Sequence, residues 1–161
     1  KIRKFNNNCQ PVTSELSIPH LGAQKWDFEA AVASDGTILV IWREESGGDK
    51  VSFQIISSSL TLVGSPVTIA SQTTGPIAIA LNDGNFLIGW TDKIGKDIYA
   101  RKITTSGTTI QEWKINSILT NAQLCKGAAS LTDNRIVIAY AADGGTRWGW
   151  MGSLFHCLLL E

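Results

Sequence analysis

The sequence lacks a long apolar run and an excess of either charge. Its 161 residues carry 14 basic and 14 acidic side chains, and no stretch of 18 apolar residues occurs. A chain without such a stretch is not expected to cross a membrane as a helix. A chain without a basic patch lacks the electrostatic footprint of a nucleic-acid-binding protein. We therefore expect no nucleic-acid partner and no membrane insertion.

Cysteine and histidine are also scarce. The three cysteines and two histidines form no C-x-x-C pair and no spacing typical of metal ligands, so no metal and no cofactor are predicted. At most one intrachain disulfide can form. Cys9 and Cys157 follow comparable predicted strands and are the candidate pair, within one chain or between copies. The chain begins at Lys1 without an apolar leader, which indicates a removed signal peptide or a fragment.

One pattern occurs three times. The segments 30–42, 78–90 and 128–140 each begin with alanine, pass through an Asp-Gly or Asp-Asn pair and end in tryptophan or tyrosine. The equivalent alanines are 48 and 50 residues apart. A near-constant period of this length is the signature of a repeat architecture. No segment shows the 3.6-residue apolar period of a helix, so the sequence predicts an all-β protein.

Each repeat can be divided into four short strands. The first strand is predicted at 28–34, 77–81 and 127–131, and the second at 37–42, 86–90 and 135–140. The pairs Asp35-Gly36, Asp83-Gly84 and Asp133-Asn134 between them suit a tight hairpin turn. Alternating residues predict the third strand at 51–55, 99–103 and 151–155, and the fourth at 67–69 and 113–115. The tail 156–161 departs from this pattern.

Four-stranded units of this length predict a β-propeller-like array of antiparallel blades, about three in number and forming a partial propeller. The whole chain, 1–161, is interpreted as one repeat domain. Residues 1–20 end a preceding blade, 21–70 and 71–120 are complete blades, and 121–161 is an incomplete blade. The recurring alanines suit the crowded inner strand. The recurring aromatics Trp42, Trp90 and Tyr140 are predicted to fill the core between blades.

The second repeat also carries a family resemblance. Its segments Asp83-Gly-Asn-Phe-Leu-Ile-Gly-Trp90 and Asp97-Ile-Tyr-Ala-Arg-Lys-Ile103 are similar to repeats in large secreted or surface proteins of bacteria and protists. Those repeats have an Asp-Gly turn, an apolar strand ending in tryptophan, a Gly/Asp loop and an I-Y-A-x-x-Phe strand. The resemblance covers residues 21–155 and implies a propeller-like fold, a role in adhesion or surface assembly, and an extracellular or cell-surface location.

Several residues are candidates for chemistry. Asp35, Asp83 and Asp133 could converge as glycosidase carboxylates, but aspartate in a hairpin turn is explained by turn geometry. The loop acids could bind calcium, and the simpler interpretation is that they are solvated; they are Glu44, Glu45, Asp49, Asp92 and Asp97. Four tryptophans do not recur between repeats and are therefore candidate ligand-binding residues: Trp26, Trp113, Trp148 and Trp150.

The sequence thus predicts a non-catalytic extracellular structural or adhesive module. Its partners would be further copies of itself or other surface proteins, joined through sheet edges, with glycans as further candidates. The first alternative is a carbohydrate-binding propeller lectin, and the second is a fragment of a propeller glycosidase. No catalytic residue is assigned.

Overall fold

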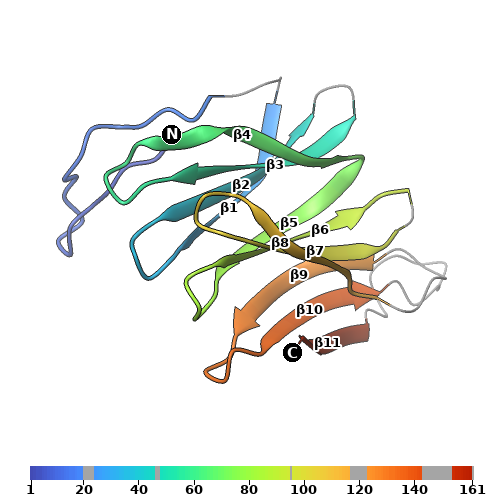
Figure 1. Cartoon of the computed structure of the whole chain (residues 1–161). Coiled ribbons are helices and arrows are strands. Elements are labelled where there is room, and N and C mark those ends of the chain that lie inside the picture. Colours follow the sequence, from blue (N-terminus) through green and yellow to red (C-terminus); the bar gives the residue numbers. More distant parts are fainter. Residues whose placement is uncertain (20–23, 46–47, 95, 117–122, 143–153, 161) are drawn as a thin grey trace.

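The computed structural model describes residues 1–19, 24–45, 48–94, 96–116, 123–142 and 154–160 (Figure 1). Every regular element in these residues is a β-strand, and paired strands run antiparallel. The strands are β1 (Gln24–Val32), β2 (Ile38–Glu45), β3 (Asp49–Ile56), β4 (Leu62–Ser71), β5 (Thr73–Ala80), β6 (Phe86–Asp92), β7 (Ile98–Ile103), β8 (Thr109–Lys114), β9 (Gln123–Ser130), β10 (Ile136–Ala142) and β11 (Leu154–Leu160). No helix long and apolar enough to cross a membrane occurs among these residues.

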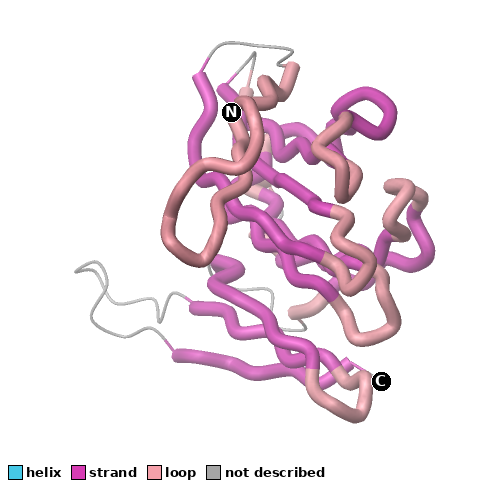
Figure 2. The backbone as a smooth tube through the Cα atoms, turned by 90° about the vertical axis from the view of Figure 1, so that its left-hand side faces the viewer, coloured by secondary structure: helices cyan, strands magenta, loops and turns pink. Residues whose placement is uncertain are grey.

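The strands form three sheets that follow one another along the chain. β1 to β4 make the first sheet, β5 to β8 the second, and β9, β10 and β11 the third, each in sequential order. Figures 1 and 2 show the sheets stacked, with the N-terminus at one end of the stack and the C-terminus at the other. β5 lies against β1 on one side and against β9 on the other. The described sheets are open and do not close into a ring.

The first 18 residues form an irregular antiparallel hairpin, here called the N-terminal hairpin. Ile2 pairs with Leu16, and Phe5 pairs with Pro11. The apolar side chains of this hairpin cover the outer face of the first sheet around Trp42, on the side away from the second sheet. The hairpin therefore packs on the first sheet as the first sheet packs on the second.

The connections that follow β1, β3, β5, β7 and β9 repeat one turn geometry. In each loop two backbone hydrogen bonds close five residues, and the fourth residue has a positive φ. In the turns after first strands the fourth residue is Gly36, Gly84 or Asn134. In the turns after third strands it is Leu60 or Gly107. The N-terminal hairpin turns the same way at Cys9, with a φ of 57°. Glycine and asparagine tolerate this left-handed conformation best, which explains the Asp-Gly and Asp-Asn pairs.

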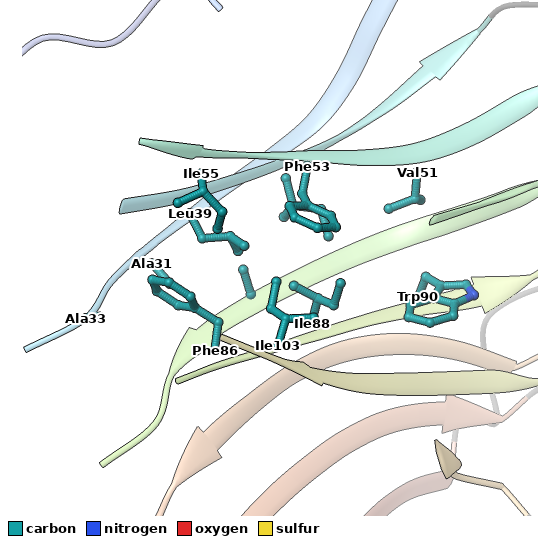
Figure 3. Close-up of a cluster of buried hydrophobic side chains, with 12 residues drawn as sticks. Ala31, Ala33, Leu39, Val51, Phe53, Ile55, Phe86, Ile88, Trp90 and Ile103 are labelled. Atoms are coloured by element: carbon teal, nitrogen blue, oxygen red, sulfur yellow. The ribbon is translucent and has the colours of Figure 1, made fainter. Parts of the chain in front are cut away.

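Three apolar clusters hold the stack together. Figure 3 shows the cluster between the first two sheets, where Leu39, Phe53 and Ile55 face Phe86 and Ile88. A second cluster joins the second sheet to the third, and a third lies under the N-terminal hairpin. Strand residues alternate between these clusters, as a strand with two buried faces requires.

The structure confirms the predicted all-β class and the three hairpins between first and second strands. The recurring aromatics are core residues as predicted, with exposed fractions of 1% for Trp42, 3% for Trp90 and 8% for Tyr140. The predicted position of the last strand, 151–155, was wrong. β11 spans Leu154–Leu160, so the segment that was expected to leave the pattern pairs with β10 instead. Residues 157–160 are apolar, so they favour a strand paired with β10 over the polar turn that the repeat required at this place.

Candidate functional site

The non-recurring tryptophans lie in different surroundings. Trp26 on β1 is 46% exposed, whereas Trp113 on β8 packs against the cluster between the second and third sheets. They sit on different sheets, and the predicted Trp148 and Trp150 lie outside the described residues. The ligand-binding role of these four residues therefore stays a prediction.

The cysteines differ in their access to solvent. Cys9 carries a free, exposed thiol in the N-terminal hairpin, and Cys125 is a free, buried thiol on β9. Burial raises the pKa of the Cys125 thiol to about 12, so this side chain stays protonated and unreactive at neutral pH. The side chain of Cys157 lies outside the described residues, and its pairing with Cys9 stays a prediction.

The hairpin aspartates serve their own turns. The Oδ1 atom of Asp35 accepts a hydrogen bond from the Thr37 amide at 2.8 Å. Asp83 and Asp133 accept the equivalent bonds from the amides of Asn85 and Arg135, both at 3.1 Å. This geometry stabilises a turn and explains why aspartate recurs there. It supports the turn interpretation of these three carboxylates.

The loop acids are less solvated than the sequence suggested. Glu44 is 2% exposed, and its Oε1 atom accepts a hydrogen bond from Ser52 at 3.1 Å. Asp97 is 7% exposed and is paired with Lys114 at 2.8 Å. Asp49 is paired with Lys93. The interpretation of Glu44 and Asp97 as solvated acids is therefore wrong, because each is held under neighbouring strands. No group of three His, Cys, Asp or Glu gathers within the described part of the chain.

A groove runs between the first and second sheets beside Trp90, and we call it the Trp90 groove. It measures ≈ 340 Å³. One wall comes from the end of β4 and the start of β5, and the other from β6, β7 and β8. Its lining residues are Ile69, Ala70, Ser71, Thr73, Trp90, Asp92, Tyr99, Arg101 and Glu112.

The Trp90 groove has a layered aromatic and charged floor. The rings of Trp90 and Tyr99 are stacked with centroids 5.9 Å apart and planes 15° apart. The Arg101 guanidinium lies 5.2 Å from the centre of the Trp90 ring. Glu112 accepts from Arg101 Nε at 2.7 Å and Nη2 at 2.5 Å. These contacts hold Arg101 in one orientation at the groove.

A second groove lies beside Trp42, where Lys25 and Phe28 of β1 line it, and we call it the Trp42 groove. It measures ≈ 350 Å³ and lies between the N-terminal hairpin and the first sheet. Lys25 lies over the Trp42 ring at 4.6 Å, as Arg101 lies over Trp90. Burial lowers the pKa of Lys25. The strand partner of Trp42 is Ser52, where the partner of Trp90 is Tyr99, so Trp42 has no stacked ring on β3; the second ring of the Trp42 groove is Phe28 of β1.

The sequence did not identify these grooves. Alternation along the third strand does place Tyr99 and Arg101 on one face of the second sheet. It does not show that the end of β4 lies opposite them. Long-range packing between consecutive sheets creates the groove, so the local pattern could supply only half of its lining.

Comparisons with known proteins support the fold. No protein-family model and no curated protein matches this sequence. Among solved structures, a protein of unknown function from Bacteroides caccae is similar with a TM-score of 0.57 and 13% sequence identity over 84% of this chain. The endo-arabinase from Bacteroides thetaiotaomicron VPI-5482 is similar with a TM-score of 0.51 and 16% identity over 93% of this chain. The chain spans 47% and 60% of the length of these two structures.

Proposed function

We propose that this protein is a non-catalytic structural module whose sheets act as blades of a propeller-like array, and that copies of it associate by stacking their sheets. The stacking of consecutive sheets through their first strands, β1 on β5 and β5 on β9, supports the blade arrangement. The resemblance to secreted and surface repeats supports an extracellular or cell-surface location and an adhesive role.

One surface carries this proposal. Phe28, Ala30 and Val32 lie on the side of β1 that faces away from the second sheet, and we call this surface the β1 face. Phe28 and Val32 are each 59% exposed. The equivalent residues of β5 include Ala78 and Ala80, which pack against the first sheet. The repeat therefore gives β1 apolar residues at positions that are buried on β5. The N-terminal hairpin does not cover these residues, so they remain exposed.

The third sheet offers a matching surface at the opposite end of the stack. Gly127 and Ala139 point away from the second sheet, opposite one another on β9 and β10, and Val137 and Ala129 form the next pair. These residues are half-buried or exposed. Their counterparts in the second sheet, Ile77 and Leu87, are 3% and 0% exposed under the third sheet.

A second copy of this chain fits the β1 face best. The third sheet of one copy against the β1 face of the next would repeat, beside the N-terminal hairpin, the contact of first strands that the chain already uses twice, between β1 and β5 and between β5 and β9. Such head-to-tail contacts produce a ring or a fibre according to the rotation between copies. This arrangement uses the sheet faces in addition to the edges that the sequence suggested.

Sedimentation velocity between 1 and about 100 µM tests the proposal, a range that brackets the affinity of weak interfaces. The wild-type chain should associate as concentration rises, and Phe28→Ser should remain monomeric because it removes an apolar side chain worth roughly 1.5–3 kcal/mol on burial. Ile94→Ser is the matched control, since Ile94 is 72% exposed in a loop. A wild-type chain that stays monomeric over the whole range would overturn the proposal.

A glycosidase fragment is the second candidate, supported by the fold similarity to an endo-arabinase. Turnover of a fluorogenic arabinoside by the chain, lost in Asp83→Asn, would favour it over a non-catalytic module. The hydrogen bond from the Asn85 amide to Asp83 already accounts for this carboxylate as a turn residue. We therefore expect no turnover.

A further inference from the structure

The Trp90 groove has the features of a small-ligand site, and we propose that it binds a neutral saccharide. Ligand sites combine an apolar floor with a few fixed polar groups. The volume of ≈ 340 Å³ is at the small end for such sites and fits about one sugar unit. Because the groove is built from two sheets of one chain, this proposal does not depend on association between copies.

The aromatic floor suits the C–H face of a sugar ring. Trp90 is 3% exposed and its ring stacks on that of Tyr99. Tyr99 is half-buried, and both residues line the groove. The stacked geometry, with planes 15° apart, fixes the Tyr99 ring before any ligand arrives. A fixed ring with a polar tip gives apolar contact and a hydroxyl partner at low cost in side-chain entropy.

Arg101 and Glu112 supply the polar part of the site. A guanidinium has five N–H donors, and the bonds from Nε and Nη2 to Glu112 use two of them. The carboxylate of Glu112, whose side chain is 40% exposed, provides acceptors beside these donors. Adjacent hydroxyls on a sugar can donate to a carboxylate and accept from a guanidinium at once. A pre-oriented pair of this kind therefore recognises a vicinal diol.

The charge of the groove selects among saccharides. The single cation of the lining, Arg101, is already paired with the carboxylate of Glu112. A phosphate, sulfate or carboxylate group that approached Arg101 would meet the Glu112 carboxylate, and like charges repel. A neutral saccharide meets no such repulsion, which is why we assign this class.

The Trp42 groove shows which feature makes the Trp90 groove special. Both grooves lie beside a recurring tryptophan that has a cation over its ring. Ser52 stands in the first sheet where Tyr99 stands in the second, so no ring stacks on Trp42 from β3, and the second ring of the Trp42 groove is Phe28 of β1. Binding at the Trp90 groove should therefore depend on Tyr99.

Saturation-transfer NMR followed by titration calorimetry on the full chain tests the proposal. The probes are neutral pentose and hexose oligosaccharides and, in parallel, oligosaccharides of uronic acids. At least one neutral probe should bind saturably. Glu112→Gln should weaken it about tenfold, the factor that ~1.4 kcal/mol represents. Tyr99→Phe should retain binding and Tyr99→Ala should lose it.

Two matched variants control for non-specific effects. Glu15→Gln changes an exposed glutamate in the N-terminal hairpin, and Phe5→Ala removes an aromatic ring that is 58% exposed. Neither should change the affinity. Absence of saturable binding to every neutral probe, stronger binding of the uronic-acid probes, or an unchanged affinity in Glu112→Gln would each overturn the proposal. Glu112 is exposed on β8, so its variant should fold even if Tyr99→Ala does not.

Discussion

β1 and β5 begin their sheets with related sequences but meet different neighbours. On β5, Ala78 is 9% exposed because the first sheet packs over it. On β1, the equivalent Ala30 is exposed, and Phe28 and Val32 on the same face are each 59% exposed. The residues on these two strand faces are apolar and would both suit burial. The difference shows that a repeat position becomes core only where another sheet lies against it.

The largest expected effect compares a covered position with an open one. Phe86→Ala removes a side chain with 0% exposure between the first two sheets and should lower the free energy of unfolding by about 3–5 kcal/mol. Val32→Ala on the β1 face should change it by less than about 0.5 kcal/mol. Urea denaturation at low protein concentration, where copies are not associated, measures both. A similar cost for the two variants would show that the β1 face is covered within one chain.

Gly89→Ala tests how tightly Ile77 packs over its strand partner Gly89 within the second sheet. A Cβ atom at Gly89 would lie 2.8 Å from Cγ1 of Ile77, an atom near the stiff branch of that side chain. Overpacking should therefore destabilise the protein by about 1–3 kcal/mol. Gly127→Ala is the matched variant on β9, since nothing lies within 4 Å of its added Cβ.

For Gly127→Ala we expect a gain of roughly 0.4–1 kcal/mol, because alanine restricts the unfolded chain more than glycine does. Thermal unfolding of both variants measures the contrast. Equal effects of the two alanines would argue that the Ile77 side chain moves freely over Gly89.

The last comparison concerns the acids at the start of the third strands, Asp97 in the second sheet and Asp49 in the first. Asp97 is 7% exposed and accepts hydrogen bonds from Lys114 at 2.8 Å and from Asn116 at 2.9 Å. The hydrogen bond from Lys114 is the main cause that lowers the pKa of Asp97, and burial opposes it. Asp49 is partly buried and is paired with Lys93 and Arg43.

A lowered pKa in the folded state fixes the sign of the pH dependence. The stabilisation from ionised Asp97 is fully present above the unfolded pKa of about 3.9 and is lost as pH falls through the lower folded pKa. Asp97→Asn should cost about 1–3 kcal/mol at neutral pH and should flatten the loss of stability below about pH 4. Urea denaturation at a series of pH values, from neutral to below about pH 4, measures the free energy of unfolding of both proteins. An unchanged acid limb in the variant would contradict the assignment.

The local features of the fold could be predicted from sequence because they depend on near neighbours. Asp35 and Gly36 form the expected turn since the aspartate accepts the amide two residues ahead and glycine tolerates φ of 83°. Long-range features could not be predicted. The burial of Glu44 depends on strands that pair with it across the sheet, and the register of β11 depends on β10.

The same division holds for the candidate site. Tyr99 and Arg101 share a strand face by simple alternation, and that much is written in the chain. Ile69 and Ser71 form the opposite wall only because the end of β4, in the first sheet, lies against the second sheet. Of the tryptophans chosen for not recurring, Trp26 and Trp113 lie on different sheets, because sequence uniqueness says nothing about which residues converge.

By itself the sequence determined the all-β class, the repeat, the turns and the burial of the recurring aromatics. Each of these depends on alternation, on turn geometry or on side-chain size within a few residues. Only the tertiary structure decided which faces of the sheets are covered, where Glu44 and Asp97 lose solvent, and where a groove forms beside Trp90. Those properties depend on which sheet lies against which, and identical local patterns leave that choice open.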